Sequence, residues 1–493
     1  MQRSFAVLLV LSAACTAGAI VVGDGLTHGV TVLLLVVALA AQVTLVVRAG
    51  RRRDKPGLDR RSVLAACGLV LLVAVLVPPR GSHDLWSYAM YGRIVVHYHA
   101  SPYEHVPAQW PADKWTLHVA HGWRQTPSVY GPAFTAFSAA GMAAVGRSFL
   151  AARLFFQLSA ALAVVAAAWL VSRHTKSAAA VALLALNPLV IVSVVNGGHN
   201  DAIVGLAVLG GVLLAARRHP AWAGAVLAGA AMIKASAALP LLAVAFWVWH
   251  RDGRRAVIRL LATAGAIGLT GYMVTGGLDG LRPLQAAGLD FSGASVWYGP
   301  RRWLAAALRH GRAAGAAGHL ARQILSTVAV ALVGAVGWLL ARRRLHTPTP
   351  ALAAGAAAFA YVLAGAYVLP WYVYWGLPAL ALAWRTRLTW LVAAYGAVLY
   401  LAEVPDLTAN PRVNRLFVAS PLQRVRSDVY LIWLPLAEAL LLAILVVGSL
   451  RRRRTGRAPG YDSALLAAPL PTYPFPSGMI TSPVVKRTST GQE

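Results

Sequence analysis

Charged residues, carboxylates and cysteines are all scarce in this sequence. Only 12% of its 493 residues are charged, whereas the wetted surface of a soluble domain usually needs about 25%. Sixteen residues are Asp or Glu, and two are Cys. The shortage of charge excludes a soluble globular domain. The two cysteines, Cys15 and Cys67, lie in apolar stretches, which excludes a disulfide framework and leaves no metal-ligand spacing between them.

What the chain has in abundance is uninterrupted apolar sequence. Hydrophobic residues make up 58% of it, the mean hydropathy is +0.62, and apolar runs occupy 31–47, 63–77 and 431–450. A helix that crosses the bilayer core needs about 20 mostly apolar residues, so we predict an all-α polytopic membrane protein with about 12–14 transmembrane helices. The segment 1–15 has the outline of a signal peptide, but a second apolar run follows so closely that we predict an uncleaved first span.

Basic clusters near the ends of the apolar runs predict the orientation, because Lys and Arg are retained on the cytoplasmic side. They indicate a multi-pass plasma-membrane protein with both termini cytoplasmic. The outer loops are then 80–129, 196–201, 276–320, 369–372 and 404–428. The run 130–146 would leave an odd number of spans, so we predict that it is re-entrant. The interval 217–250 is too short for two full spans and predicts a short or broken hairpin.

The same orientation explains the net charge of +29, which reflects cytoplasmic loops facing anionic lipid and does not indicate nucleic acid. Residues 1–454 are expected to form one transmembrane domain. Residues 455–493 are rich in Pro, Ser and Thr and predict a disordered cytoplasmic tail.

The few carboxylates fall mostly at outer loops or outer ends of spans, and Asp84 lies in the richest of these regions, 82–103. On a helix Asp84 and Tyr88 share a face. The simpler interpretation is a capping aspartate followed by an amphipathic helix at the membrane surface. That interpretation leaves Arg93 and Tyr103 unexplained, so a catalytic Asp84 is the alternative.

Two further segments place polar side chains among apolar ones. His199, Asn200 and Asp201 are consecutive, in a segment that simple turn chemistry would also explain. Because ionisable groups at membrane depth are costly and usually functional, we predict a site there. Lys234 lies alone in an apolar run, where it either extends to a lipid head group or binds a phosphate.

Three other groups of residues have an equally simple alternative. Arg301 and Arg302 are a candidate phosphate clamp or ordinary surface arginines. Trp371 and Tyr372 belong to an aromatic belt or line a groove for a sugar or a polyprenyl chain. Six of the 14 histidines fall between His83 and His121, but no metal-binding motif accompanies them, so we interpret them as polar residues of a wet loop.

These residues, in this order, resemble the multispan glycosyltransferases of the GT-C fold, and among them the actinobacterial polyprenol-phosphate-mannose-dependent alpha-1,6-mannosyltransferases. The resemblance spans 80–375. Its features are Asp84 with WSYAMYGR and SPY, YGP at 130–132, LNPL at 186–189, GGHND at 197–201, Lys234, and LPWYVYW at 369–375.

The resemblance implies that Asp84 is the general base of an inverting transfer from a polyprenyl-phosphate sugar, usually mannose, to a lipid-linked glycan such as a growing mannan. We expect no globular C-terminal domain of the kind that larger members of the fold carry, so that acceptor recognition would fall to loops. We predict no metal and no other cofactor. The predicted substrate-binding residues are His83, Tyr88, Arg93, Tyr103, Tyr130, His199, Asn200, Asp201, Lys234, Arg301, Arg302, Trp371 and Tyr372.

A transporter or flippase of polyprenyl-linked sugars is the main alternative, and a membrane scaffold without enzymatic activity is a third hypothesis. A transporter would also have many spans and outer loops. Against it stand the absence of an internal repeat and the concentration of polar groups on one side of the membrane instead of at its midplane. A scaffold would make no special demand on Asp84.

Overall fold

The computed structural model describes most of the chain up to the end of its last helix. The described residues are 2–23, 28–51, 58–79, 82–275, 277–281, 290–293, 295–309, 314–342, 344–403 and 432–454. The predicted tail 455–493 and the whole predicted outer loop 404–428 lie outside them. Every regular element in these ranges is a helix, which confirms the all-α polytopic membrane fold.

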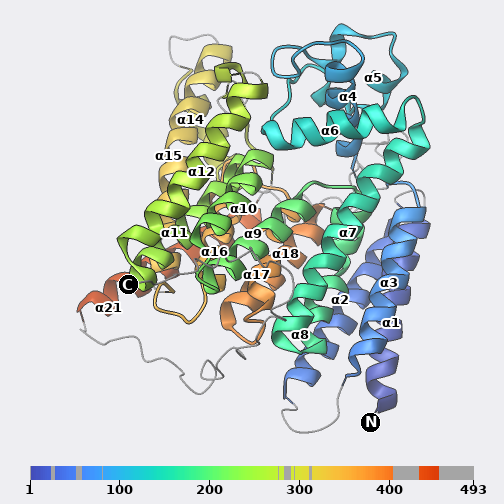
Figure 1. Ribbon diagram of the computed structural model, residues 1–493, viewed down its shortest axis with the longest axis vertical. Coiled ribbons are helices and arrows are strands. Elements are labelled where there is room, and N and C mark those ends of the chain that lie inside the picture. The colour runs from blue at the N-terminus through green and yellow to red at the C-terminus, as the bar shows by residue number, and fades with distance from the viewer. Residues whose placement is uncertain are drawn as a thin grey trace, which may run out of the picture. The chain divides into compact units, whose positions relative to one another are not determined.

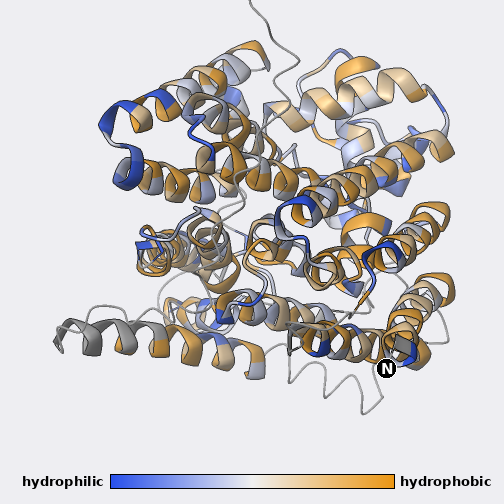
Figure 2. Cartoon of the chain, turned by 60° about the horizontal axis from the view of Figure 1, so that its bottom comes forward, coloured by the Kyte–Doolittle hydropathy of each residue, from blue (hydrophilic) through white to orange (hydrophobic). Residues whose placement is uncertain are grey.

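Five helices are long and apolar enough to cross a bilayer. They are α1 (Gln2–Val22), α2 (His28–Arg51), α7 (Phe149–Thr175), α12 (Arg254–Thr275) and α15 (Ala314–Arg342). A sixth candidate is a broken span, in which α8 (Ala178–Ala185) and the π-helix η3 (Val190–Asn196) meet at 56°. Hydrophobic residues cover most of the helices, while hydrophilic ones gather at helix ends and loops (Figure 2).

Eight other helices in the described ranges complete the bundle. They are α3 (Arg60–Leu76), α6 (Pro132–Val145), α9 (Asp201–Ala216), α10 (Pro220–Ile233), α11 (Ala238–Asp252), α16 (Ala351–Ala364), α18 (Arg387–Glu403) and α21 (Leu434–Arg454). A helix of 14 residues such as α6 is about 21 Å long, less than the hydrocarbon core of about 30 Å. Figure 1 shows α6 lying across the direction of α7. The total of 12–14 spans stays a prediction.

Two further segments deviate from regular helix. Between α10 and α11 the chain is extended at Lys234 (φ −139°, ψ 119°) and makes one 3-10 turn, η4 (Ala235–Ala237), which confirms the broken hairpin. The apolar sequence of 373–384 by itself predicts a regular span, and this prediction is wrong. The 3-10 helix η6 (Pro370–Trp375) and the five-residue α17 (Leu377–Ala381) occupy this segment, because Pro370 and Pro378 cannot donate the hydrogen bonds of a longer helix.

The segment predicted as the first large outer loop contains several short helices. It contains α4 (Asp84–Val96), α5 (Lys114–His118) and the 3-10 turns η1 (Pro107–Gln109) and η2 (His121–Trp123). A second surface region holds η5 (Gly277–Leu281) and α14 (Tyr298–Ala307). Helix α4 packs closely on α6, since a Cβ atom at Gly92 would lie 2.4 Å from the carbonyl oxygen of Ser138.

The C-terminal end of α3, just before Asp84, is held by three buried side chains. Asn196 donates to the carbonyl oxygens of Ala74, Val77 and Pro78 at 2.9–3.2 Å. Gln157 of α7 donates to Ala74 and Val77 at 3.1 Å and to the carbonyl oxygen of Asn196 at 2.7 Å. Arg153 donates to Leu76. The last carbonyls of a helix lack partners within it, so these bonds fix the direction in which the chain leaves α3.

Substitution Asn196→Leu tests this anchor. It keeps the side-chain volume but removes three hydrogen bonds to the end of α3, of which the bond to Ala74 is buried, and a hydrogen bond of this kind contributes about 0.5–1.5 kcal/mol. We expect a lower midpoint of thermal unfolding for the detergent-solubilised protein. The control is Ser159→Ala on α7, whose hydroxyl bonds only to its own helix at Phe155 and should change stability little. Equal midpoints for the two variants would contradict the anchoring role.

Candidate active site

Asp84 is the first residue of α4, where the helix dipole favours a negative side chain. Its backbone N–H donates to the hydroxyl of Ser82 at 3.1 Å. Its Oδ2 atom lies 3.6 Å from Nε2 of His199, and 23% of its side chain remains exposed. The carboxylate is therefore partly enclosed by polar neighbours and still reachable from outside.

Burial raises the pKa of the Asp84 carboxyl to about 6. The carboxylate of Asp201 adds to the rise, whereas the ammonium of Lys234 and the hydroxyl of Ser82 oppose it. A general base works best when its pKa is close to the operating pH. Asp84 therefore has the protonation behaviour of a base that accepts a proton near neutrality.

The turn between η3 and α9 brings His199 beside Asp84. Gly198 adopts a positive φ of 66°, which a residue with a side chain rarely tolerates. His199 is fully buried. Its Nε2 atom lies 3.0 Å from the hydroxyl of Ser82, and its ring stacks on Trp371 at a centroid distance of 4.1 Å. The segment is a tight turn, and it also orients polar side chains toward Asp84.

An ion pair lies next to this turn. Lys234 donates from Nζ to Oδ1 of Asp201 at 2.7 Å, and only 13% of the lysine side chain is exposed. The indole N–H of Trp375 donates to the same carboxylate oxygen. The ammonium lies 4.2 Å from the ring centroid of Tyr372 and 5.3 Å from that of Trp375, as in cation–π contacts. The alternative in which Lys234 extends to a lipid head group is therefore wrong.

The YGP segment packs directly against the residues that precede Lys234. The N–H of Gly131 donates to the carbonyl oxygen of Ile233 at 3.1 Å. A Cβ atom at Gly131 would lie 2.2 Å from the carbonyl oxygen of Met232. Tyr130 in turn meets the ring of Tyr88 edge-on at 5.0 Å. A glycine is thus required for α6 and the end of α10 to approach each other beside the site.

Several buried polar atoms around Asp84 lack a hydrogen-bond partner among the described residues. They are the hydroxyl of Tyr88, both polar atoms of the Asn200 side chain, and Oδ2 of Asp201. Buried polar groups are nearly always satisfied in a complete structure. Unpaired groups gathered beside a partly exposed carboxylate are therefore available to hydrogen-bond a polar substrate.

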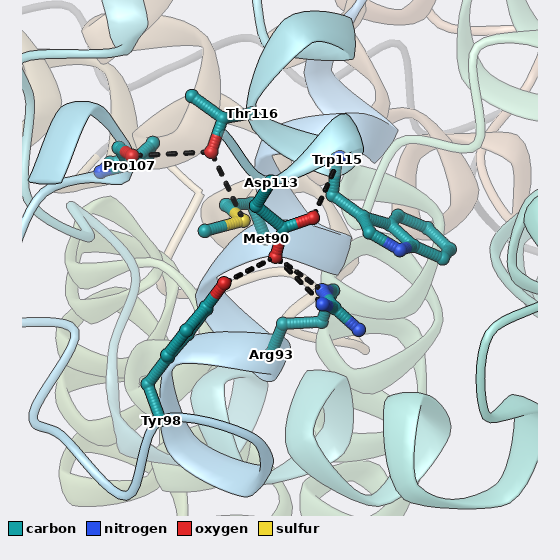
Figure 3. Close-up of polar contacts among 7 residues, drawn as sticks. All are labelled: Met90, Arg93, Tyr98, Pro107, Asp113, Trp115 and Thr116. Carbon is teal, nitrogen blue, oxygen red and sulfur yellow. Dashed lines mark hydrogen bonds and ion pairs between the residues drawn. The ribbon is translucent and has the colours of Figure 1, made fainter. Parts of the chain in front are cut away.

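Some of the predicted site residues are engaged elsewhere. Figure 3 shows Arg93 and Tyr98 both bound to the carboxylate of Asp113. Nη2 of Arg93 donates to Oδ2 of Asp113 at 2.7 Å, and the hydroxyl of Tyr98 donates to the same oxygen at 2.7 Å. The network fastens α5 to α4. Tyr103 shares a hydrogen bond of 3.0 Å with Thr135.

The remaining predicted residues also differ in their surroundings. His83 lies 3.2 Å from the carbonyl oxygen of His118. Arg301 packs over Tyr298 on α14, and Arg302 is exposed. No contact described for either arginine reaches Asp84 or Lys234.

Trp371 and Tyr372 form part of the wall of the site and are not an open groove. Both are buried, and their faces meet His199 and Lys234. Sequence reasoning missed Ser82 and the direct bond of Trp375 to Asp201. In the sequence, only the position of Ser82 two residues before Asp84 indicates that it belongs to the site. Trp375 stands out only as one of several aromatic residues in 369–375.

Comparison with known proteins gives one family. The sequence profile described as "Alpha-(1->6)-mannopyranosyltransferase, N-terminal domain" matches residues 5–251, which include Asp84, His199, Asp201 and Lys234 but not η6. The chain is 26% identical over 409 residues to the alpha-(1->6)-mannopyranosyltransferase B of Corynebacterium glutamicum, covering 74% of this chain and 65% of that protein.

A probable alpha-(1->6)-mannopyranosyltransferase of Mycolicibacterium smegmatis is 28% identical over 411 residues, covering 73% of this chain and 70% of the relative. The chain thus spans just under two thirds of the length of the Corynebacterium protein. No solved structure matches it.

Substitution Gly131→Ala tests the close approach beside the site. The added Cβ would meet backbone at 2.2 Å, so α6 and the end of α10 must separate, and overpacking of this kind costs about 1–3 kcal/mol. We expect a lower unfolding midpoint measured in detergent. Gly229→Ala on α10 is the control, since a Cβ there meets nothing within 4 Å. An unchanged midpoint for Gly131→Ala would contradict the packing argument.

Proposed function

The chain belongs to the alpha-(1->6)-mannopyranosyltransferase family, and on that premise we propose that it is an inverting glycosyltransferase of the plasma membrane. It moves a hexose, mannose in our proposal, from a polyprenyl phosphate to a hydroxyl of a lipid-linked glycan of the alpha-1,6-mannan type. The observation that carries the proposal is Asp84, a partly exposed carboxyl with a raised pKa beside a buried lysine.

Asp84 serves as the general base. It accepts the proton of the acceptor hydroxyl while that oxygen attacks the anomeric carbon. The bond from this carbon to the phosphate oxygen breaks, and the phosphate leaves with the electron pair from the opposite face, so the configuration inverts. Ser82 and His199 support this role because they fix one side of the carboxylate and leave its exposed side to the acceptor.

Lys234 is the group proposed to bind the donor phosphate. Its ammonium has three N–H donors, and the carboxylate of Asp201 accepts from it at 2.7 Å. A lysine aimed at the departing phosphate stabilises the charge that develops there. Because neither arginine contacts this region, Arg301 and Arg302 have less support as a phosphate clamp.

The unpaired groups of Tyr88 and Asn200 are proposed to bind sugar hydroxyls. No metal enters the mechanism, since a basic side chain takes the role of charge stabilisation, and nucleic acid is not a proposed partner. The outer-face location is proposed from the direction of α3, which begins at the basic residues Arg60 and Arg61 and ends shortly before Asp84. Membrane lipid surrounds the apolar helices and delivers both lipid-linked substrates.

Substitution Asp84→Asn tests the proposed base. The purified chain is reconstituted in liposomes with labelled polyprenyl-phosphate mannose and a lipid-linked mannan acceptor, and sugar transfer is measured. Removing a general base typically costs about 10²–10⁴-fold, so we expect kcat to fall by at least about 100-fold with KM for the donor little changed. Glu104→Gln, an exposed carboxylate of the same loop, is the control and should keep full activity.

Two outcomes of this experiment would count against the enzyme. Transfer at the normal rate by Asp84→Asn would remove Asp84 from the mechanism. Labelled sugar that crosses the bilayer without forming a glycosidic bond would favour the transporter hypothesis.

The pH dependence of sugar transfer follows from the protonation state that Asp84 needs as a general base. A base has to be deprotonated, and the pKa of this carboxyl is about 6. Activity is therefore expected to rise about tenfold per pH unit below pH 6 and to level off above it. Ser82→Ala removes a hydroxyl that lowers the pKa of Asp84, so its profile should move to higher pH. Ser101→Ala, in the same outer loop, is the control, and identical profiles for the two variants would contradict this role of Ser82.

A further inference from the structure

A long groove runs between α1 and α3, away from the candidate active site. It has a volume of about 780 Å³. On α1 it extends from Phe5 to Ala17, which corresponds to about 18 Å along the helix, more than half of the hydrocarbon core. On the other side it extends from Leu58 to Val73. The groove is thus as long as a large part of a lipid tail.

The walls of the groove are almost entirely apolar. Alanines such as Ala14 and Ala65 line it, and larger side chains at these exposed positions would take up part of the space. Two bulkier residues that also line it, Val10 and Leu69, are 64% and 63% exposed. Because α1 is a candidate membrane span, lipid tails surround these exposed side chains. A hydrocarbon chain is therefore the occupant that the walls and the environment fit.

One end of the groove is lined by polar residues, and arginines outside the lining follow them in the sequence. Asp59 and Ser62 line it there, and both the N–H and the hydroxyl of Ser62 bond to the Asp59 carboxylate at 2.8 Å. The exposed residues Arg60 and Arg61 follow directly in the first turn of α3, and Arg3 is exposed in the first turn of α1. Three guanidinium groups at the start of two parallel helices favour an anionic group at this end.

We propose that this groove is a binding site for an anionic phospholipid, with one acyl chain between α1 and α3 and the head group at Arg60 and Arg61. The site is distinct from the proposed donor site. Asp84 follows the opposite end of α3, whose 17 residues separate the two ends by about 25 Å. Figure 1 shows α1 and α3 side by side, with α4 beyond the far end of α3. A phosphate held at Arg60 is therefore too far from Asp84 to react.

The test measures which lipids stay on the full-length protein. The purified chain is incubated with equal amounts of phosphatidylglycerol and phosphatidylcholine carrying the same acyl chains, and retained lipid is counted by native mass spectrometry. We expect preferential retention of phosphatidylglycerol. Each arginine near an anionic lipid contributes about 1 kcal/mol, so Arg60→Gln with Arg61→Gln should lower the preference about 30-fold. Arg259→Gln, an exposed arginine of α12, is the matched control.

A second pair of variants separates the groove from the head-group contact. Ala14→Leu with Ala65→Leu fills the groove, and we expect retained phosphatidylglycerol to fall at least about tenfold, since each buried CH₂ contributes about 0.8 kcal/mol. Ala40→Leu, exposed on α2 and outside the groove, should have no effect. Equal retention of the two lipids, or retention unaffected by filling the groove, would overturn the proposal. So would displacement of phosphatidylglycerol by polyprenyl phosphate at equal concentration.

Discussion

The buried ion pair between Lys234 and Asp201 joins two places where a helix is interrupted. Lys234 stands at the extended break between α10 and α11, and Asp201 begins α9 after the turn that follows η3. In an apolar bundle a charged group is tolerated only with a partner, since losing one partner of a buried pair costs several kcal/mol. The ion pair therefore holds both interruptions in place, because each one supplies the charge that the other needs as its partner. The rest of the site is assembled around this pair.

Other segments meet at the same point for related reasons. Trp375 bonds to Asp201, and the aromatic face of Tyr372 lies under Lys234, so the irregular η6 supplies both contacts. Gly131 closes the opposite side by bonding to the end of α10. Non-helical backbone within a membrane protein is stable only where protein or a polar cavity covers it. In this chain the interruptions of the helices and the candidate site coincide.

The two ends of α3 show how differently the same helix is used. At its C-terminal end, buried amides such as Asn196 satisfy the last carbonyls and direct the chain toward Asp84. At its N-terminal end, Asp59 caps the helix beside exposed arginines and an apolar groove. The first end is rigid and suits chemistry that needs a carboxylate in a fixed place. The second faces lipid and suits binding that tolerates variation in the ligand.

The sequence alone determined the all-α membrane fold, a short or broken hairpin within 217–250 and the candidate residues Asp84 and Asp201, because apolar length and isolated polar groups in apolar surroundings are local features. Only the tertiary structure decided which polar residues meet. Arg93 pairs with Asp113, 20 residues away, and Lys234 with Asp201, 33 residues away. No local periodicity encodes such pairs, since they depend on how helices pack and where they break. The raised pKa of Asp84 likewise arises from burial, which is a property of the folded chain.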